Sequence, residues 1–414
     1  MRDNALVAAL RKIGHDALMI PLYTPLTTDE PDNSESRIFF GGLNVYLQQK
    51  SPLFRMTPGW LDRPLDSRGL IKFATGFGIK TNPEDVGDLM ISMLKGEHGN
   101  QGKELEKLCV WLKDHSNAGV ICLSNVLLSG MAPRLKAELN IPIVCTLQGE
   151  DFFLDGLPGK LREEAWGLVR ECAKSIDAFI PVSQYYGNIM AQRLELPEER
   201  VHAVMNGIEL AGYAEASAPP TAPRIGYLSR IAPEKGLMTL VAAFQQIRAR
   251  GNVPNVELHI AGSLTPTDKP FFEKVETALR DAGAQVKFFP NLNRENKVSF
   301  LQSLSVLSVP AAYGESFGLY VLEALACGVP VVQPLHGAFP ELLAVTGGGE
   351  LYKPDDPGDL ALKIEALLLD EPRRKALGTG GRQKVLAHFT IERVAREVAA
   401  VLQSVTGAKK SGSN

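Results

Sequence analysis

The sequence has few of the residues that mark metal, redox or disulfide-linked proteins. Only five cysteines and seven histidines occur among its 414 residues. The cysteines (Cys109, Cys122, Cys145, Cys172 and Cys327) have no metal-ligand spacing, and the histidines form no cluster. Because most of the cysteines lie in apolar runs, we interpret them as small buried side chains in a reducing compartment. We therefore expect a cytoplasmic location, with no metal ion and no cofactor.

Strong charge and long apolar runs are also lacking. The formal net charge is −3, so no broad basic surface indicates a nucleic-acid partner. No apolar run reaches the length that spans a bilayer. The hydrophobic content of 45% and the charged content of 22% are those of an ordinary globular protein, and 414 residues favour two domains over one.

Apolar runs alternate with helix-like segments along most of the chain. Strands are predicted at residues 119–124, 142–147, 178–183, 201–205, 224–228, 256–261, 285–289, 306–309 and 329–333. Strands that alternate with helices imply mostly parallel sheets covered on both faces. This pattern places the chain in the α/β class.

We divide this alternation into two halves. The first is predicted at residues 1–210 and the second at 224–390, joined by a linker at 211–223 that is rich in alanine and proline. A final amphipathic helix is predicted at 391–406. Residues 407–414 are expected to be a disordered tail.

The first eighty residues depart from the regular pattern. A short helix is predicted first, and an apolar run at 16–23 follows it as a strand. Residues 37–47 are strand-like, with a turn at Gly41-Gly42. Residues 51–78 mix aromatic and basic side chains, for which a peripheral membrane contact and a lid packed on the domain are both open interpretations.

The densest functional pattern lies in residues 311–332. An apolar strand leads into a glycine-rich loop, and a helix starts at Leu319. The first amides of a helix lack partners within it, so a strand, a glycine-rich loop and a helix start together form an anion site. Glu315 in the loop and Glu323 on the helix frame this site. Ionised carboxylates accept strong hydrogen bonds, which suits the hydroxyls of sugars and ribose.

A second pattern lies upstream, in residues 224–237. A predicted strand ends near Arg230, and Lys235-Gly236 opens a helix. Two cations therefore stand at the carboxyl end of a strand, where ligands bind in open α/β sheets. A basic strand end together with an amide-rich helix start is suited to a diphosphate.

Together the two stretches resemble the donor site of the retaining glycosyltransferases of family 4, the "group 1" glycosyltransferases, which have the GT-B fold. The resemblance is specific over residues 200–345 and looser before them. It implies two Rossmann-like doubly wound domains that face each other across a cleft. It also implies transfer of a sugar from a UDP- or GDP-sugar to a sugar, glycan or lipid-linked acceptor, with retention of configuration and without a metal.

The resemblance also assigns roles to single residues. Arg230 and Lys235 would neutralise the leaving diphosphate, Glu315 would contact the donor sugar, and these three are the catalytic candidates. Glu323 would contact the ribose. The remaining donor-site candidates are Gly262, as a glycine of close approach, and Phe317, Gly318 and Leu319, whose backbone amides would add donors.

In the first half, Gln148 stands where the resembled family usually has a histidine near the reacting sugar. Glutamine can hydrogen-bond a sugar hydroxyl but cannot act as an acid or a base. Glu150 and Asp151 follow it directly and are candidates for the missing role. A cap or turn role suits Asp151 equally well.

The amino terminus departs most from the resembled pattern. In the family a strand and a glycine-rich loop precede the first helix, and both are lacking here. We expect either that the natural protein starts upstream of Met1 or that the segment at 16–23 pairs with the strand at 119–124 in their place.

Three alternatives to a transferase remain open at this point. One is a GT-B enzyme of another reaction type, such as a nucleotide-sugar epimerase or a phosphorylase. A second is a catalytically weak protein that binds nucleotide sugars. The third, a dinucleotide-binding oxidoreductase, lacks support because no G-x-G-x-x-G follows a strand.

Overall fold

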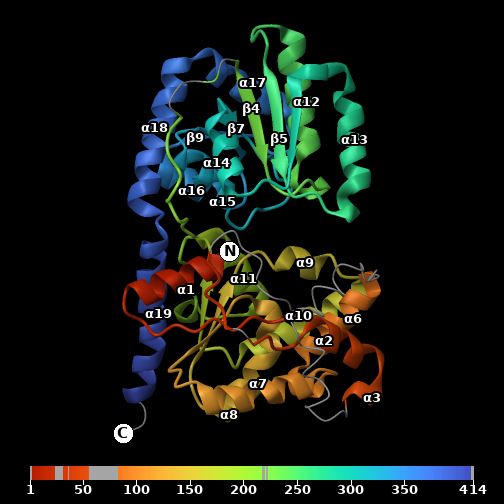
Figure 1. The fold of residues 1–414 in the computed structure, drawn as a ribbon, viewed down its shortest axis with the longest axis vertical. Helices are drawn as coiled ribbons and strands as arrows, with labels where there is room; N and C mark the ends of the chain where they lie inside the picture. The colour runs from red at the N-terminus through yellow and green to blue at the C-terminus, as the bar shows by residue number, and fades with distance from the viewer. Residues whose placement is uncertain are drawn as a thin grey trace. The chain divides into compact units, whose positions relative to one another are not determined.

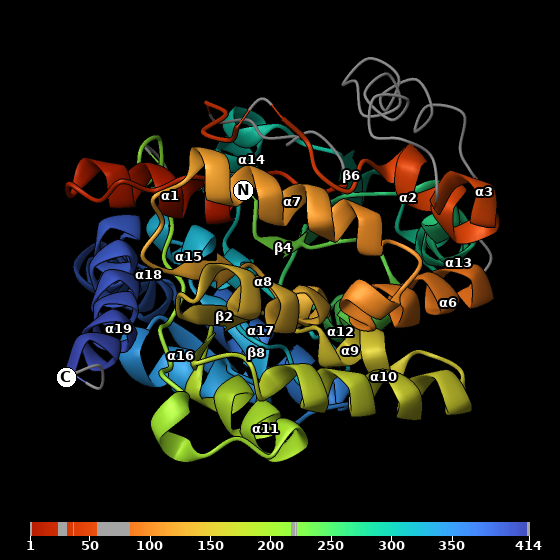
Figure 2. The same cartoon turned by 90° about the horizontal axis from the view of Figure 1, so that it is seen from below.

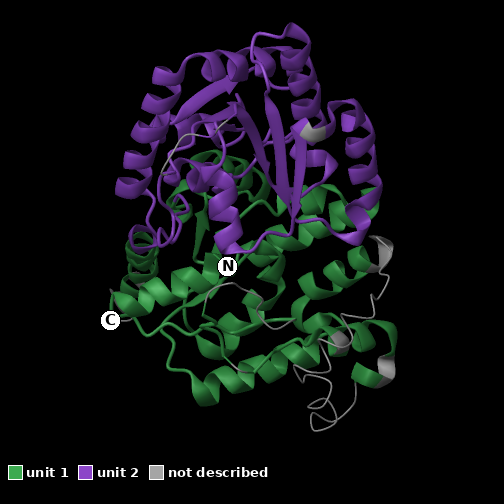
Figure 3. Cartoon of the chain, turned by 45° about the horizontal axis from the view of Figure 1, so that its top comes forward, with its two compact units in different colours: residues 1–204, 395–414 green, residues 205–394 purple. Residues whose placement is uncertain are grey.

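A computed structural model describes residues 2–23, 31–35, 37–55, 83–216, 220 and 222–411. The chain forms two compact units, which Figure 3 colours separately. Unit 1 comprises residues 1–204 and 395–414, and unit 2 comprises residues 205–394. Each unit is described by itself below.

Unit 1 is built from helices around a short sheet. Its described helices and strands are α1 (Arg2–Lys12), α2 (Gly42–Lys50), α3 (Pro52–Arg55), α6 (Pro83–Leu94), η1 (Gly96–His98), α7 (Gly102–His115), β1 (Ile121–Leu123), η2 (Val126–Met131), α8 (Ala132–Leu139), β2 (Ile143–Leu147), α9 (Asp151–Asp155), α10 (Gly159–Ala173), β3 (Ala178–Pro181), α11 (Gln184–Leu194) and η3 (Glu198–Arg200). Helices α7 and α8 lie side by side, and so do α10 and α11 (Figures 1 and 2).

The sheet of unit 1 has the parallel order β1-β2-β3. Every residue of β2 and β3 is buried, as expected for strands with helices on both faces. Val201 continues this sheet by a single bridge to Phe179 of β3. The three strands lie within the runs that the sequence predicts, so this part of the prediction is confirmed.

The segment at 16–23 does not join this sheet. Met19 and Leu22 form isolated bridges with Ser34 and Phe39, and β1 pairs with β2 alone among the described strands. The expected pairing of this segment with residues 119–124 is therefore wrong. Local pairing with residues 34–39 satisfies its backbone instead.

The strand predicted at 37–47 is also wrong, because helix α2 begins at Gly42 with Gly41 as its N-cap. Asn44 and Gln48, four residues apart on one helix face, are both fully buried. The Gln48 Nε2 donates to Oε1 of Glu104 on α7 at 2.8 Å. This buried polar contact fixes the segment as a helix, although its apolar residues have strand propensity.

Unit 2 alternates strands and helices more regularly. Its described elements are β4 (Arg224–Leu228), η4 (Pro233–Lys235), α12 (Leu237–Arg250), β5 (Glu257–Gly262), η5 (Pro266–Asp268), α13 (Lys269–Leu279), η6 (Arg280–Gln285), β6 (Val286–Pro290), α14 (Arg294–Gln302), β7 (Val306–Leu307), α15 (Leu319–Ala326), β8 (Val331–Pro334), α16 (Phe339–Thr346), β9 (Gly349–Tyr352), α17 (Pro357–Leu369) and α18 (Glu371–His388).

The sheet of unit 2 is parallel throughout, with the order β6-β5-β4-β7-β8-β9. Its first strand, β4, is central, with β5 on one side and β7 on the other (Figure 1). This is the strand order of a doubly wound dinucleotide-type fold, so the expected α/β class and Rossmann-like topology are confirmed here. In such sheets the crevice for ligands lies beside the carboxyl ends of the two strands where the order reverses.

The last helix, α19 (Ile391–Ser411), belongs to both units. Its first residues are counted with unit 2, and its residues from Ala395 onward are counted with unit 1. The helix continues to Ser411, so the irregular tail predicted from residue 407 is wrong for residues 407–411.

None of the described helices is both long and apolar enough to cross a membrane. The segment at 51–78, for which a peripheral membrane contact is one interpretation, lies mostly outside the described residues.

A buried histidine lies in the amino-terminal half of strand β5 in unit 2. His259 on β5 is only 4% exposed, and its Nε2 lies 2.8 Å from Oε2 of Glu257. The same oxygen accepts a hydrogen bond from Nε of Arg224 at 2.8 Å, and Lys287 lies 3.8 Å away. Burial lowers the pKa of His259 below its ordinary value, although Glu257 opposes this shift.

We predict that this histidine makes unit 2 sensitive to acid. A lowered pKa means that the unfolded chain binds the proton more readily than the folded one. The contribution of this histidine to the free energy of unfolding is therefore most favourable above about pH 6.5 and decreases as the pH falls below that value. In thermal unfolding between pH 7.5 and 5.5, the wild type should lose melting temperature relative to His259→Phe. The exposed His388→Asn variant should keep the slope of the wild type, and equal slopes for all three proteins would contradict the prediction.

Candidate functional site

The loops that follow β4 and β7 lie where doubly wound sheets have their ligand-binding crevice, and we call this position the crevice of unit 2. The loop after β4 carries Arg230 and Lys235, and the loop after β7 carries Glu315. Both strands are neighbours at the point where the strand order reverses. The structure therefore places these three candidates at the carboxyl edge of the sheet, where the topology favours a ligand.

Lys235 and Glu315 form the centre of this group. Lys235 Nζ lies 2.7 Å from Oε2 of Glu315 and 2.5 Å from the hydroxyl of Tyr313, whose ring it also faces at 4.9 Å. The hydroxyl of Tyr320 donates to the same Glu315 oxygen at 3.1 Å. Burial opposes the charge on Lys235, but the nearby Glu315 outweighs it and raises the pKa of Lys235. The ammonium group is thus held charged inside the crevice.

Arg230 is held differently from Lys235. Its guanidinium forms an ion pair with Glu234, four residues along, and 47% of its side chain remains exposed. The backbone carbonyl of Arg230 accepts a hydrogen bond from the buried Tyr227 hydroxyl at 3.0 Å. This hydrogen bond anchors the backbone of the loop, while the guanidinium group itself stays accessible to a ligand.

Glu323 lies one helix further along the chain and has its own partners. It forms an ion pair with Lys297 on α14, and its Oε1 accepts a hydrogen bond from the hydroxyl of Tyr213 at 2.9 Å. The Arg294 guanidinium stacks over the Tyr213 ring at 5.4 Å. Burial and Glu323 raise the pKa of the Tyr213 hydroxyl, so it stays a donor.

Sequence reasoning missed four of these side chains: Tyr213, Lys297, Tyr313 and Tyr320. Tyr213 falls in the stretch taken as a linker, and its partner Glu323 lies 110 residues away. The two other tyrosines lie within the stretch at 311–332 itself. Their closeness to Glu315 in the sequence was the signal from which they could have been predicted.

The loop at 314–318 carries the amide donors expected for an anion. Phe317 is buried, whereas Leu319 is partly exposed at the first position of α15. Gly318 is the N-cap in the left-handed conformation, with φ of 86°, and it provides no side-chain cap. The first amides of α15 therefore lack a side-chain acceptor from their own cap residue.

Gly262 has a structural reason to be glycine. A Cβ at this position would lie 1.6 Å from the carbonyl oxygen of Ser229, in the loop that leads to Arg230. The lack of a side chain allows the end of β5 to approach that loop. The close approach at Gly262 is thus between the end of β5 and the loop that contains Ser229, and both belong to unit 2.

The other three candidates lie on unit 1, at the carboxyl end of β2. Gln148 Nε2 donates to the carbonyl of Ser124 at 2.5 Å. Glu150 is buried, and Asp151 is the first residue of α9, where an acidic side chain complements the helix dipole. The structure thus gathers these residues in one loop beside the end of β1.

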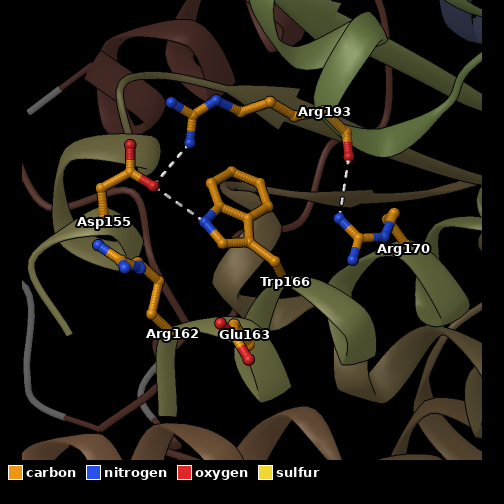
Figure 4. A pocket seen from close by; sticks show the side chains of 6 residues that line it. All are labelled: Asp155, Arg162, Glu163, Trp166, Arg170 and Arg193. Atoms are coloured by element: carbon orange, nitrogen blue, oxygen red, sulfur yellow. Dashed lines mark hydrogen bonds and ion pairs between the residues drawn. The ribbon is translucent and has the colours of Figure 1, made fainter. Parts of the chain in front are cut away.

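The described residues contain no group of three or more side chains that could hold a metal ion. A cavity on unit 1 is lined by Asp155, Arg162, Glu163, Trp166, Arg170 and Arg193 (Figure 4). Asp155 accepts hydrogen bonds from Trp166 Nε1 at 3.0 Å and from Arg193 at 2.7 Å. Its carboxylate is therefore already paired with Arg193, and none of the predicted site residues lines this cavity.

Comparison with known families agrees with this geometry. The family described as "Glycosyltransferase Family 4" matches residues 104–211, and "Glycosyl transferases group 1" matches residues 214–384. The second match contains both loops of the crevice. The chain belongs to the group 1 glycosyltransferases.

Two relatives of this group 1 glycosyltransferase are both named as mannosyltransferases. The phosphatidyl-myo-inositol mannosyltransferase of Mycolicibacterium smegmatis is 28% identical over 58% of this chain and 61% of its own length. A GDP-mannose-dependent mannosyltransferase of Corynebacterium glutamicum is 32% identical over 44% of this chain and 48% of its own length. The chain thus spans between about half and three-fifths of these two relatives.

Solved structures share the fold at low identity. The sucrose-phosphate synthase of Thermosynechococcus elongatus has a TM-score of 0.63 at 22% identity, over 74% of this chain and 79% of its own. Anabaena HepE in complex with UDP-glucose has a TM-score of 0.64 at 16% identity, over 93% of this chain and all of its own. These likenesses show the GT-B fold for the group 1 glycosyltransferase.

We predict opposite effects for two glycine substitutions in unit 2. Gly262→Ala would force a Cβ against the Ser229 carbonyl, and it should destabilise the protein by about 1–3 kcal/mol. Gly380→Ala lies in helix α18 with nothing near its Cβ, and it should stabilise by about 0.5–1 kcal/mol. Chemical denaturation measures both, and a neutral Gly262→Ala would show that the β5 end is not tightly packed.

Proposed function

We propose that this protein transfers a sugar from a UDP- or GDP-sugar to a sugar, glycan or lipid-linked acceptor, with retention of configuration. The observation that carries the proposal is the pairing of Lys235 with Glu315 at 2.7 Å in the crevice of unit 2. This pair sets a cation suited to a diphosphate beside a carboxylate suited to sugar hydroxyls. A nucleotide sugar presents both a diphosphate and sugar hydroxyls.

The main task in such a transfer is to stabilise the negative charge that develops on the leaving diphosphate. Lys235 and the accessible Arg230 would supply this stabilisation, together with the first amides of α15. Glu323 would hold the ribose through its remaining oxygen, because Oε1 is already paired with Lys297 and Tyr213.

Two of the similar proteins support the donor class. HepE has been solved with UDP and with UDP-glucose, and one relative is named for its dependence on GDP-mannose. The five cysteines of the chain are all free, which agrees with the reducing cytoplasm that we propose as its location.

Two measurements, made one after the other, test the proposed function. A thermal-shift screen of UDP- and GDP-sugars should identify a donor, because a ligand that binds the folded state raises the melting temperature. NMR of the product should then show the anomeric configuration of the donor sugar retained. Binding without any product would favour a nucleotide-sugar-binding protein, and an epimerised nucleotide sugar would favour the other reaction class.

We predict that Arg230→Ala weakens the binding of the free nucleoside diphosphate by about 1.5–3 kcal/mol, the range of a hydrogen bond to a charged group. The matched control is Arg280→Ala, which removes the same charge from an exposed position of unit 2. Calorimetry with UDP and GDP gives both affinities. Equal affinities for the two variants would remove Arg230 from the site.

We also predict that activity does not depend on a divalent cation. Arg230 and Lys235 can carry out the charge neutralisation that a metal performs in other transferases. Initial rates should be the same after extensive dialysis against EDTA and after the addition of magnesium or manganese. A strict requirement for either ion would show that the diphosphate is held in another way.

A further inference from the structure

A buried carboxylate lies under the loop at the carboxyl end of β2 in unit 1. Oε2 of Glu150 accepts hydrogen bonds from the backbone amides of Gln148 at 2.8 Å and Gly149 at 3.0 Å. It also accepts one from the hydroxyl of Tyr186 on α11 at 3.0 Å. Three donors therefore converge on one oxygen, and Gly149 permits this turn by its positive φ of 119°.

The second oxygen of the same carboxylate is not satisfied. Glu150 is 7% exposed, and its Oε1 is buried with no hydrogen-bond partner in the described part of the chain. Buried polar atoms are nearly always paired in native proteins, so such an exception calls for an explanation. A purely structural support of the turn could be supplied by a neutral side chain without this cost.

No ion pair between Glu150 and a cation occurs among the described residues. Tyr186 of α11 donates to its carboxylate, Cys145 of β2 interacts with it electrostatically, and the backbone amide of Asp151 donates to the same Tyr186 hydroxyl. Arg2 of α1 donates to Thr146, which also accepts a hydrogen bond from Gln148. Burial raises the pKa of Glu150, although the hydrogen bonds to the carboxylate oppose this shift.

We propose that Glu150 is a positioning residue for the sugar transfer, acting through the turn that carries Gln148. The ionised carboxylate holds the amides of Gln148 and Gly149 and so fixes Gln148 at the carboxyl edge of the unit 1 sheet. This role rests on the function proposed above, because it gives Gln148 the sugar contact that the resemblance assigns to this position.

The proposal separates the effects of Glu150 on stability and on transfer. A carboxyl whose pKa is raised by folding binds its proton more tightly in the folded chain, so its contribution to stability falls as the pH rises. Loss of the acceptor oxygen should nevertheless lower transfer, because it releases the amides of Gln148 and Gly149. Glu150→Gln removes this titration while it keeps an oxygen that can accept from both amides.

The experiment compares the wild type with Glu150→Gln, Glu150→Ala and Tyr186→Phe between pH 5 and 8.5. In Glu150→Gln, the melting temperature should equal or exceed that of the wild type at pH 8, and kcat/KM for the acceptor should stay closer to the wild-type value than in Glu150→Ala. Glu150→Ala should lower kcat/KM for the acceptor at least tenfold, whereas donor binding should stay within twofold in all variants. Tyr186→Phe should give an intermediate loss, since it removes one of the three donors.

Hydrogen exchange of the peptide 147–153 provides a readout that does not depend on turnover. Exchange should accelerate about tenfold or more in Glu150→Ala and less in Glu150→Gln. An unchanged exchange rate in Glu150→Ala would overturn the proposal, and so would equal kcat/KM for the acceptor in Glu150→Ala and the wild type. If the wild type binds donor but forms no product, the proposed transfer fails, and the exchange data still decide whether Glu150 holds the turn.

Discussion

The reversal of strand order around β4 is the constraint on which the donor side of this protein depends. A central parallel strand with neighbours on both sides needs crossovers on both faces of the sheet, and the loops after β4 and β7 diverge at its carboxyl end. Glycine allows these loops to pack closely. A Cβ at Gly236 would lie 1.6 Å from the carbonyl of Pro310, so Lys235 is brought beside Glu315 by backbone packing.

The two acids of the crevice differ in what their neighbours allow. Glu315 lies in a loop and is held by Lys235 at the end of η4 and by Tyr320 of α15, so its position depends on side chains close to it in the fold. Glu323 sits on a rigid helix and is reached by Lys297 and Tyr213 from separate elements. One carboxylate is thus placed by the loop and the other by the helix, and a ligand that contacts both spans two differently supported groups.

Strands β4, β5, β7 and β8 of unit 2 were predictable because each is a largely buried apolar run, and that signal is local. Strand β9 was not predicted, because Gly349–Tyr352 contains a glycine and a glutamate and forms an edge of the sheet. Helix α2 was missed because a buried contact between Gln48 and Glu104 decides it. The charged residues of the site could be predicted from their types and spacing in the sequence. The partners Tyr213 and Lys297 could not, because they depend on contacts between distant segments. The support of Gln148 by Glu150 depends on burial, which no spacing reveals.

Helix α19 has a consequence for how the chain is made. Ala395, Val398 and Ala399 are buried, and the residues from Ala395 onward complete unit 1, whose other residues end at 204. The ribosome synthesises all of residues 205–394 in between, which takes about 10–40 s at roughly 5–20 residues per second. Throughout this interval the emerging first unit lacks its last helix and keeps an apolar face uncovered. The second unit is therefore the first to be complete, and the order of completion is the reverse of the order of synthesis.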